Sequence, residues 1–155
     1  KQLGFKYRPS IIWNKQVNKI NGAFGTWLSA AAPFLAAPIE LVLIFYKDSW
    51  SRTKEAGTST ITKEEFLDYA RGVWSITGVH TGKHPAAFPE ELPARCIKLF
   101  SFVEDVILDP FAGSGTTLVA ARRLGRANIG VEISPEFCQL TVERVQTVWP
   151  MTASN

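Results

Sequence analysis

The sequence predicts an α/β protein built around two parallel strands that a helix connects. Three observations predict it: a strand-like apolar run at 106–108 enters a glycine turn, a helical stretch follows at 116–124, and a second strand-like run covers 128–133. A strand, a helix and a strand in this order form a βαβ unit, in which helices cover parallel strands. The 155 residues suffice for one domain with a buried core.

Three further extended segments precede this unit. The apolar runs at 10–13 and 40–46 read as strands, and the second of them is continuous enough to be buried. Because a long irregular stretch joins them, we expect an antiparallel pair at one edge of the fold. A shorter extended run covers 73–76.

Three helices complete the expected elements around the βαβ unit. Thr62 and Glu65 form a capping box, so a helix begins there. Pro89 opens another helix at its first turn, and Ser134 caps the last one. The buried face of that last helix is expected to hold Phe137, Leu140, Val145 and Val148.

Composition indicates a globular protein with a mild excess of positive charge. The apolar fraction is 46% and the formal net charge is +3, which tolerates a polyanionic partner without requiring one. Cys96 and Cys138 lie in expected helices and read as buried thiols of a reducing, cytoplasmic compartment. With two histidines, a metal cluster is not expected. The most apolar stretch, 34–46, is too short to span a membrane.

The segment from Asp105 to Ser134 carries the strongest functional signal. Its turn reads Asp-Pro-Phe-Ala-Gly-Ser-Gly-Thr-Thr over 109–117, after a strand and before a helix. Glycine lets a ligand approach the backbone closely, and amides of a first helical turn can bind an anionic group. Glu132 follows Gly113 by 19 residues, where nucleoside-binding βαβ folds grip a ribose diol. The alternative is a plain glycine turn with a surface glutamate.

The residues around the turn narrow the class of cofactor. A dinucleotide loop would have a third glycine where Leu118 stands, and the Gly-Lys-Ser/Thr of a P-loop is absent from the sequence. Asp109 offers a carboxylate and Phe111 an aromatic face, and both attract an ammonium or sulfonium group. A zwitterionic, cationic cofactor is therefore favoured over a polyphosphate.

The 109–117 motif resembles the S-adenosylmethionine loop of DNA amino-methyltransferases, which modify N4 of cytosine or N6 of adenine. The segment 84–92, His-Pro-Ala-Ala-Phe-Pro-Glu-Glu-Leu, resembles the other cofactor-lining motif of the family, which directly precedes the glycine loop in the permuted, β-class-like branch. The segment 129–137 resembles the ribose-binding strand and the helix after it. Weaker likeness covers 10–15, 25–29 and 73–76.

The resemblance implies a Rossmann-like methyltransferase sheet, S-adenosylmethionine as methyl donor, and double-stranded DNA with a flipped target base as acceptor. Carried over by position, Asp109 would hold the amino-acid part of the cofactor and Glu132 the ribose hydroxyls. The other cofactor-binding residues would be Phe111, Gly113, Ser114, Gly115, Thr116 and Thr117 in the turn, with His84, Pro85 and Phe88 closing the pocket near the methionine moiety.

The chain departs from the family in lacking the catalytic Asp/Asn/Ser-Pro-Pro-aromatic motif, since no Pro-Pro pair occurs in it. In the permuted order that motif lies upstream, on central strands of the sheet. We therefore expect the C-terminal portion of a restriction-modification-type methyltransferase, with an incomplete sheet and no catalytic residue of its own. A second copy or the missing N-terminal polypeptide would cover the open sheet edge. The alternative is an inactive remnant that binds cofactor, DNA or protein.

Residues 1–155 are accordingly expected to form a single partial domain. An antiparallel strand pair with loops would occupy 1–60, helices and a cofactor-lining segment 61–104, and a cofactor-binding βαβα unit 105–149. Basic side chains and tryptophans of the first part could face DNA, although solvated lysines and core tryptophans explain them equally well. They are Arg8, Lys15, Lys19, Lys47, Arg52, Lys54 and Lys63, with Trp13, Trp27 and Trp50.

Overall fold

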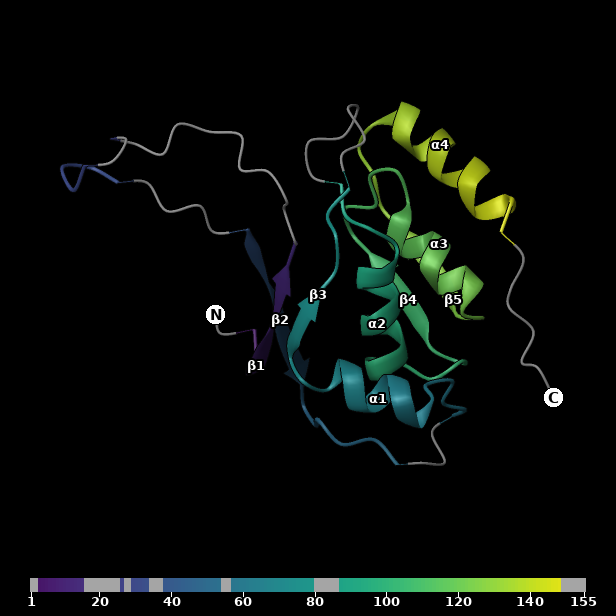
Figure 1. Ribbon diagram of the computed structural model, residues 1–155. Coiled ribbons are helices and arrows are strands. Elements are labelled where there is room, and N and C mark those ends of the chain that lie inside the picture. Colours follow the sequence, from purple (N-terminus) through teal and green to yellow (C-terminus); the bar gives the residue numbers. More distant parts are fainter. Residues whose placement is uncertain are drawn as a thin grey trace.

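The computed structural model describes residues 3–15, 26, 29–33, 38–53, 57–79 and 87–148. In these residues two strands come first, helices and strands then alternate, and the four helices lie beside two small sheets (Figure 1). In order they are β1 (Phe5–Asn14), β2 (Ile39–Lys47), α1 (Lys63–Tyr69), β3 (Val73–Ser75), α2 (Glu91–Phe100), β4 (Val106–Asp109), α3 (Thr116–Arg123), β5 (Ala127–Gly130) and α4 (Pro135–Gln146).

The strands form two separate sheets, in agreement with the incomplete sheet that the sequence predicts. One sheet has the order β2-β1-β3 and the other is the pair β4-β5. The pair β1-β2 is antiparallel and the pair β4-β5 is parallel, so both predicted pairings are confirmed. The parallel pairing of β3 with β1 was not predicted. Within the described residues, no strand joins the two sheets.

The fold has two halves: one contains the sheet β2-β1-β3, and the other contains β4, α3 and β5. Helix α2 connects them through its apolar side chains. Leu92, Cys96 and Leu99 pack against a cluster of Ile11, Trp13, Trp74 and Ile76 from the first sheet. Ile97, also on α2, packs with Ala120 and Ala121 of α3. The indole nitrogens of Trp13 and Trp74 donate to the carbonyls of Ile76 (2.8 Å) and Tyr69 (2.9 Å). Burial with satisfied indole donors makes this cluster the main core of the first half.

The structure places the two cysteines in helices α2 and α4, where both are partly buried rather than fully buried as expected. Cys96 and Cys138 are both free, and burial raises the pKa of the Cys96 thiol to about 11. No helix in the described part of the chain is long and apolar enough to cross a membrane. Among the same residues, no group of three or more metal-ligating side chains comes together.

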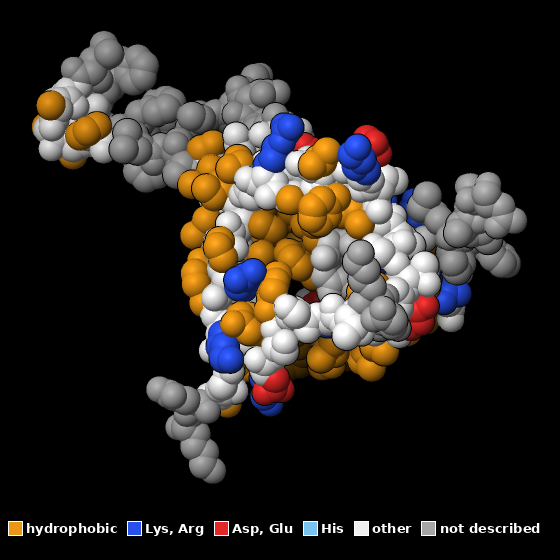
Figure 2. Space-filling view, turned by 90° about the horizontal axis from the view of Figure 1, so that it is seen from below, with side chains coloured by type: hydrophobic (Ala, Val, Ile, Leu, Met, Phe, Trp, Pro, Cys, Tyr) orange, Lys and Arg blue, Asp and Glu red, His pale blue; other side chains and the backbone are white. Residues whose placement is uncertain are grey.

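One face of each sheet is apolar and exposed. On β4 and the chain after β5, Val106, Leu108 and Val131 are more than half exposed. On β2, Leu41, Leu43 and Phe45 are exposed in the same way, while Val42 and Ile44 pack inward. Figure 2 shows hydrophobic side chains over much of the lower surface of the molecule, around a hollow. Parallel strands are ordinarily covered on both faces, whereas the described elements cover only one face of the pair β4-β5.

Several expectations about element limits and burial were wrong. Strand β1 begins at Phe5, five residues before the expected start of the run at 10–13. Helix α2 begins at Glu91 rather than at Pro89, which precedes its cap. Strand β5 ends at Gly130, so Glu132 lies two residues beyond it. On α4, Leu140 is 38% exposed and Thr141 is buried instead. The caps themselves are confirmed: Thr62 and Glu65 form the capping box and Ser134 caps α4.

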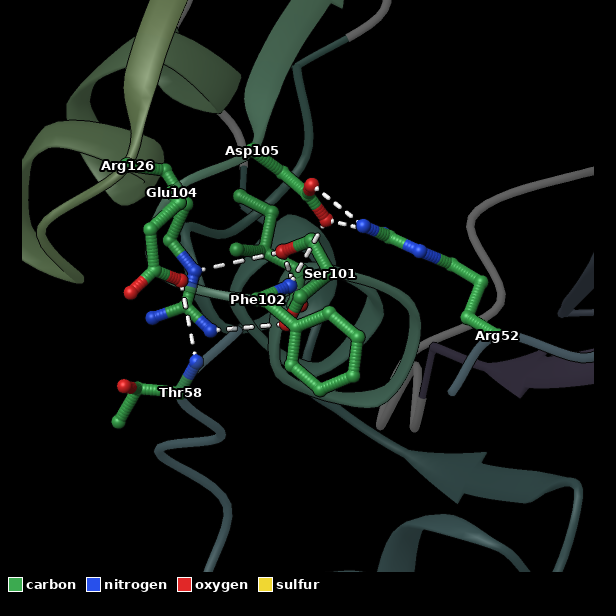
Figure 3. Close-up of polar contacts among 8 residues, drawn as sticks. Arg52, Thr58, Ser101, Phe102, Glu104, Asp105 and Arg126 are labelled. Atoms are coloured by element: carbon green, nitrogen blue, oxygen red, sulfur yellow. Dashed lines mark hydrogen bonds and ion pairs between the residues drawn. The ribbon is translucent and has the colours of Figure 1, made fainter. Parts of the chain in front are cut away.

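A polar network ties the segment after β2 to the amino end of β4 (Figure 3). Arg52 donates twice to the carboxylate of Asp105, at 2.5 and 2.9 Å. The buried guanidinium of Arg126 donates to the Ser101 carbonyl (3.0 Å) and the Thr60 hydroxyl (2.7 Å). The bonds to Asp105 and Thr60 join residues 53 and 66 positions apart in sequence. Together with α2, they hold the two halves together in place of a shared strand.

Acid is expected to weaken this network. The hydrogen bonds from Arg52 lower the pKa of Asp105 in the folded chain. The stabilisation is therefore complete above the pKa of the unfolded chain, about 3.9. It is lost as the pH falls through the lower pKa of the folded chain. We expect Asp105→Asn to lower the midpoint of thermal unfolding by about 4 °C at pH 7. The difference between the variant and the original chain should shrink below about pH 4. A difference that stays constant down to about pH 2 would contradict this assignment.

Candidate functional site

The glycine turn lies between β4 and α3, where the predicted unit places it. Gly113 and Gly115 have φ angles of 52° and 80°, in the left-handed region that disfavours a side chain. The Gly115 amide donates to the Ala112 carbonyl at 2.7 Å, which closes the turn. Gly115 is also the N-cap of α3. The two glycines are therefore required by the backbone itself, before any ligand is considered.

The carboxylate of Glu132 lies against this turn. Its Oε2 accepts a hydrogen bond from the Gly113 amide at 2.8 Å, and its Oε1 accepts one from the Ser134 amide at 2.9 Å. The carboxylate therefore joins the glycine turn to the start of α4. The predicted proximity of the turn and the acid is borne out in the geometry.

Backbone pairing continues beyond the two parallel strands and fixes this geometry. The Val131 amide donates to the Asp109 carbonyl, and the Ala112 amide donates to the Val131 carbonyl, both at 2.9 Å. The turn and the segment that carries Glu132 therefore stay in register at the carboxyl ends of β4 and β5. This is the edge at which open α/β sheets bind their ligands.

Asp109 and Phe111 lie at the start of the turn. The Asp109 carboxylate accepts from the Phe111 amide at 3.0 Å, which forms a local Asx turn. The Phe111 ring is 88% exposed, so its face is open to a partner. The arrangement offers a carboxylate and an aromatic surface next to the glycines, and both could hold a cationic, nucleoside-containing molecule.

The remaining predicted site residues fall into three groups. Ser114, Thr116 and Thr117 are partly buried in the turn and the first positions of α3. Phe88 is partly buried and packs against the core cluster that contains Trp13 and Trp74. The expectation for His84 and Pro85 falls outside the described residues.

Two residues of α4 that the sequence did not single out also contact the turn. The Thr141 hydroxyl donates to the Gly113 carbonyl at 2.9 Å, and the Arg144 guanidinium donates to the Ser114 carbonyl. Thr141 is 7% exposed, which is unusual because threonine side chains are mostly exposed. Its spacing of four from both Phe137 and Val145 on one helical face is the signal that could have found it.

The absence of a third loop glycine also has a structural explanation. A Cβ on Gly130 of β5 would lie 2.4 Å from Leu118 Cδ1 and 3.1 Å from Ala112 Cβ. In a dinucleotide loop, a glycine on the helix makes room for the strand. Here a glycine on the strand, Gly130, makes room for the helix. The close approach of α3 to the sheet is thereby kept with Leu118 in place.

The basic and aromatic residues of the first part do not form one uniform surface. Trp13 is a core residue at 3% exposure, which favours the plainer of the two interpretations for it. Lys15 pairs with Glu40, and Arg52 pairs with Asp105. Arg8 stacks over the exposed Trp50 ring at 4.4 Å. Lys47 and Lys63 are exposed, and the expectations for Lys19, Lys54 and Trp27 lie outside the described residues.

Comparisons with known proteins agree with this geometry. M.MjaI, a type II methyltransferase of Methanocaldococcus jannaschii, is 35% identical over 93% of this chain and 50% of its own length. M.MthZI, a type II methyltransferase of Methanothermobacter thermautotrophicus, is 33% identical over 92% of this chain and 44% of its own length. The chain therefore spans about half the length of these relatives.

Solved structures give the same result for the fold. The protein TTHA0409 of Thermus thermophilus, in its complex with S-adenosyl-L-methionine, matches with a TM-score of 0.71 and 35% identity over 98% of this chain and 60% of that one. The cytosine-N4-specific PvuII DNA methyltransferase matches with a TM-score of 0.65 at 24% identity, over 92% of this chain and 52% of that one. The fold is an incomplete form of this Rossmann-like architecture.

The family comparison covers nearly the whole chain. The family described as "DNA methylase" matches residues 1–143, which include both sheets, the glycine turn and Glu132. The predicted resemblance to DNA amino-methyltransferases is confirmed by this match and by the relatives above. The chain belongs to the DNA methylase family.

Proposed function

We propose that this chain is the S-adenosylmethionine-binding part of a DNA methyltransferase. The observation that carries the proposal is the bond between the Glu132 carboxylate and the Gly113 amide at the carboxyl ends of two parallel strands. An acid and a glycine turn in this arrangement fit a nucleoside with a ribose diol. When bound, the cofactor supplies an activated methyl group on a sulfonium centre.

The side chains of the site divide the binding task. Glu132 accepts hydrogen bonds from the ribose hydroxyls, while Asp109 attracts the cationic amino-acid part. The exposed ring of Phe111 and the turn residues 113–117 line the cofactor. The resemblance to the family assigns the closing of the pocket to Phe88, His84 and Pro85. Methyl transfer to an amine needs no protein nucleophile, so positioning and electrostatics are the contribution of this chain.

The acceptor in this proposal is an exocyclic amine of adenine or cytosine in double-stranded DNA, flipped out of the helix. The family supports DNA as substrate, and the mild positive charge is compatible with it. The catalytic Pro-Pro motif would be supplied on another stretch of polypeptide, together with strands beside β4. The relatives, about twice as long as this chain, have room for such a stretch.

The second candidate is a remnant that binds cofactor, DNA or another protein without catalysis. The exposed apolar faces of β2, β4 and β5 favour an assembly role of this kind, because large apolar patches mark interaction sites. Both candidates bind the cofactor through the same site. They differ in whether methylation appears once the remaining strands are supplied. In either case we expect the chain to act in the cytoplasm.

Calorimetric titration tests the cofactor assignment directly. We expect the chain to bind S-adenosylmethionine at one site and to bind NAD at least about tenfold more weakly, since the turn has neither a third glycine nor a lysine for phosphates. S-adenosylhomocysteine, which keeps the nucleoside, should compete with S-adenosylmethionine. No binding of S-adenosylmethionine, or equal binding of NAD, would refute the proposal.

A further inference from the structure

Helix α4 contacts the backbone of the glycine turn at a different group from the one that Glu132 holds. The Gly113 amide donates to Glu132, while the Gly113 carbonyl accepts from the Thr141 hydroxyl at 2.9 Å. Both polar groups of this one residue are therefore held by side chains from outside the turn. The next carbonyl, of Ser114, accepts from Arg144.

Thr141 also touches the second glycine of the turn. A Cβ on Gly115 would lie 2.6 Å from Thr141 Cγ2 and 2.9 Å from its Oγ1. Both the methyl and the hydroxyl lie close to Gly115, and the hydroxyl alone also bonds to the Gly113 carbonyl. Close packing at this point requires both a glycine on the turn and a small side chain on α4.

We infer that Thr141, assisted by Arg144, is a positioning residue for the cofactor turn. By fixing the Gly113 and Ser114 carbonyls, α4 holds the turn in the shape that presents its Gly113 amide to Glu132 before a ligand arrives. A preorganised turn binds more tightly because less conformational freedom is lost on binding. This inference rests on the proposed function, since it assigns a role within the same site.

Thr141→Val and Thr141→Ser separate the two contacts of this side chain. Valine keeps the volume and the methyl packing but cannot donate a hydrogen bond, and serine keeps the hydroxyl without the methyl. The second methyl of valine takes the position of the hydroxyl next to the Gly113 carbonyl, so that carbonyl loses its donor. The matched control is Thr147→Val, which removes an exposed hydroxyl that donates to Arg144 within the same helix turn.

We expect Thr141→Val to weaken S-adenosylmethionine binding by about tenfold, because a carbonyl in the turn loses its partner, whereas Thr141→Ser and Thr147→Val stay within about threefold of the original chain. In the ligand-free chain, amide hydrogen exchange at Gly113 should accelerate in Thr141→Val but not in Thr141→Ser or Thr147→Val. Arg144→Met should give a smaller change in the same direction. Circular dichroism confirms that each variant is folded.

The two readouts keep the inference separate from the proposed function. If the original chain does not bind S-adenosylmethionine, the proposed function fails, and the exchange rates in the ligand-free chain still decide whether Thr141 holds the turn. If the original chain binds and Thr141→Val matches it in affinity and in Gly113 exchange, the inference is overturned and the function stands. Equal losses of affinity in Thr141→Val and Thr141→Ser would show that packing, and not the hydrogen bond, causes the effect. That result would also overturn the inference.

Discussion

Replacing Glu132 by alanine is expected to weaken S-adenosylmethionine binding by at least about a hundredfold. The carboxylate anchors the Gly113 and Ser134 amides at 2.8 and 2.9 Å, and in the proposed function it also accepts the ribose hydroxyls. Hydrogen bonds to a charged group contribute about 1.5–3 kcal/mol each, and about 2.8 kcal/mol corresponds to a hundredfold change in affinity. Isothermal titration calorimetry measures the effect.

Glu136→Ala is the matched control for this experiment. Glu136 lies in the first turn of α4, is exposed, and carries the same charge four residues further along the chain. Its removal tests whether net charge alone changes the affinity. If Glu132→Ala binds within about threefold of the original chain while remaining folded, the ribose-binding assignment is wrong.

The turn and its acid could be predicted from the sequence because their signals are local. Gly113 and Gly115 require positive φ angles, and the spacing to Glu132 follows from the length of one helix and one strand. The strand limit was harder to predict: β5 ends at Gly130, and Glu132 reaches the turn from the backbone beyond it. The pairing of Val131 with Asp109 and Ala112 explains why the acid still arrives in register.

The contacts of α4 could not be predicted in the same way. A pattern of apolar residues identifies a face of a helix but not the rotation at which it meets the rest of the fold. The expected face contained Leu140, whereas the structure buries Thr141, because the carbonyl of Gly113 is the partner that this helix meets. The spacing of Thr141 from Phe137 and Val145 places it on their face of the helix, but nothing in the sequence identifies the Gly113 carbonyl as its partner.

The division of the sheet was predictable because it follows from a missing motif rather than from local propensity. What the sequence did not reveal is how the halves are held together. Helix α2 packs on both, and Arg126 buries its guanidinium against carbonyls and hydroxyls between them. Buried arginines are rare unless their donors are satisfied, and here three of the bonds end on Thr60, Ser101 and Leu124.

The largest change in activity is expected from adding polypeptide rather than from a substitution. We expect the 155-residue chain alone to show no methyl transfer to DNA, and we expect transfer to appear on mixing with a polypeptide that carries the Pro-Pro-aromatic motif and its strands. The two polypeptides are expected to associate because one apolar face of β4 and β5 is uncovered. Val106, Leu108 and Ile129 are 54–60% exposed on β4 and β5, and each such side chain contributes about 1.5–3 kcal/mol when it is fully buried.

Transfer of a radiolabelled methyl group from S-adenosylmethionine to DNA measures this outcome, and sedimentation measures the assembly. A matched control is the same mixture with Leu108→Lys, which places a charge on the apolar face of β4 and should prevent association while leaving Glu132 and the turn untouched. Association into a dimer of this chain alone would assign the apolar face to a second copy. Methylation by the chain alone would contradict the proposal that another stretch of polypeptide supplies the catalytic motif. A folded monomer that stays inert with every added strand-bearing partner would show that the uncovered face has another role and would favour the non-catalytic candidate.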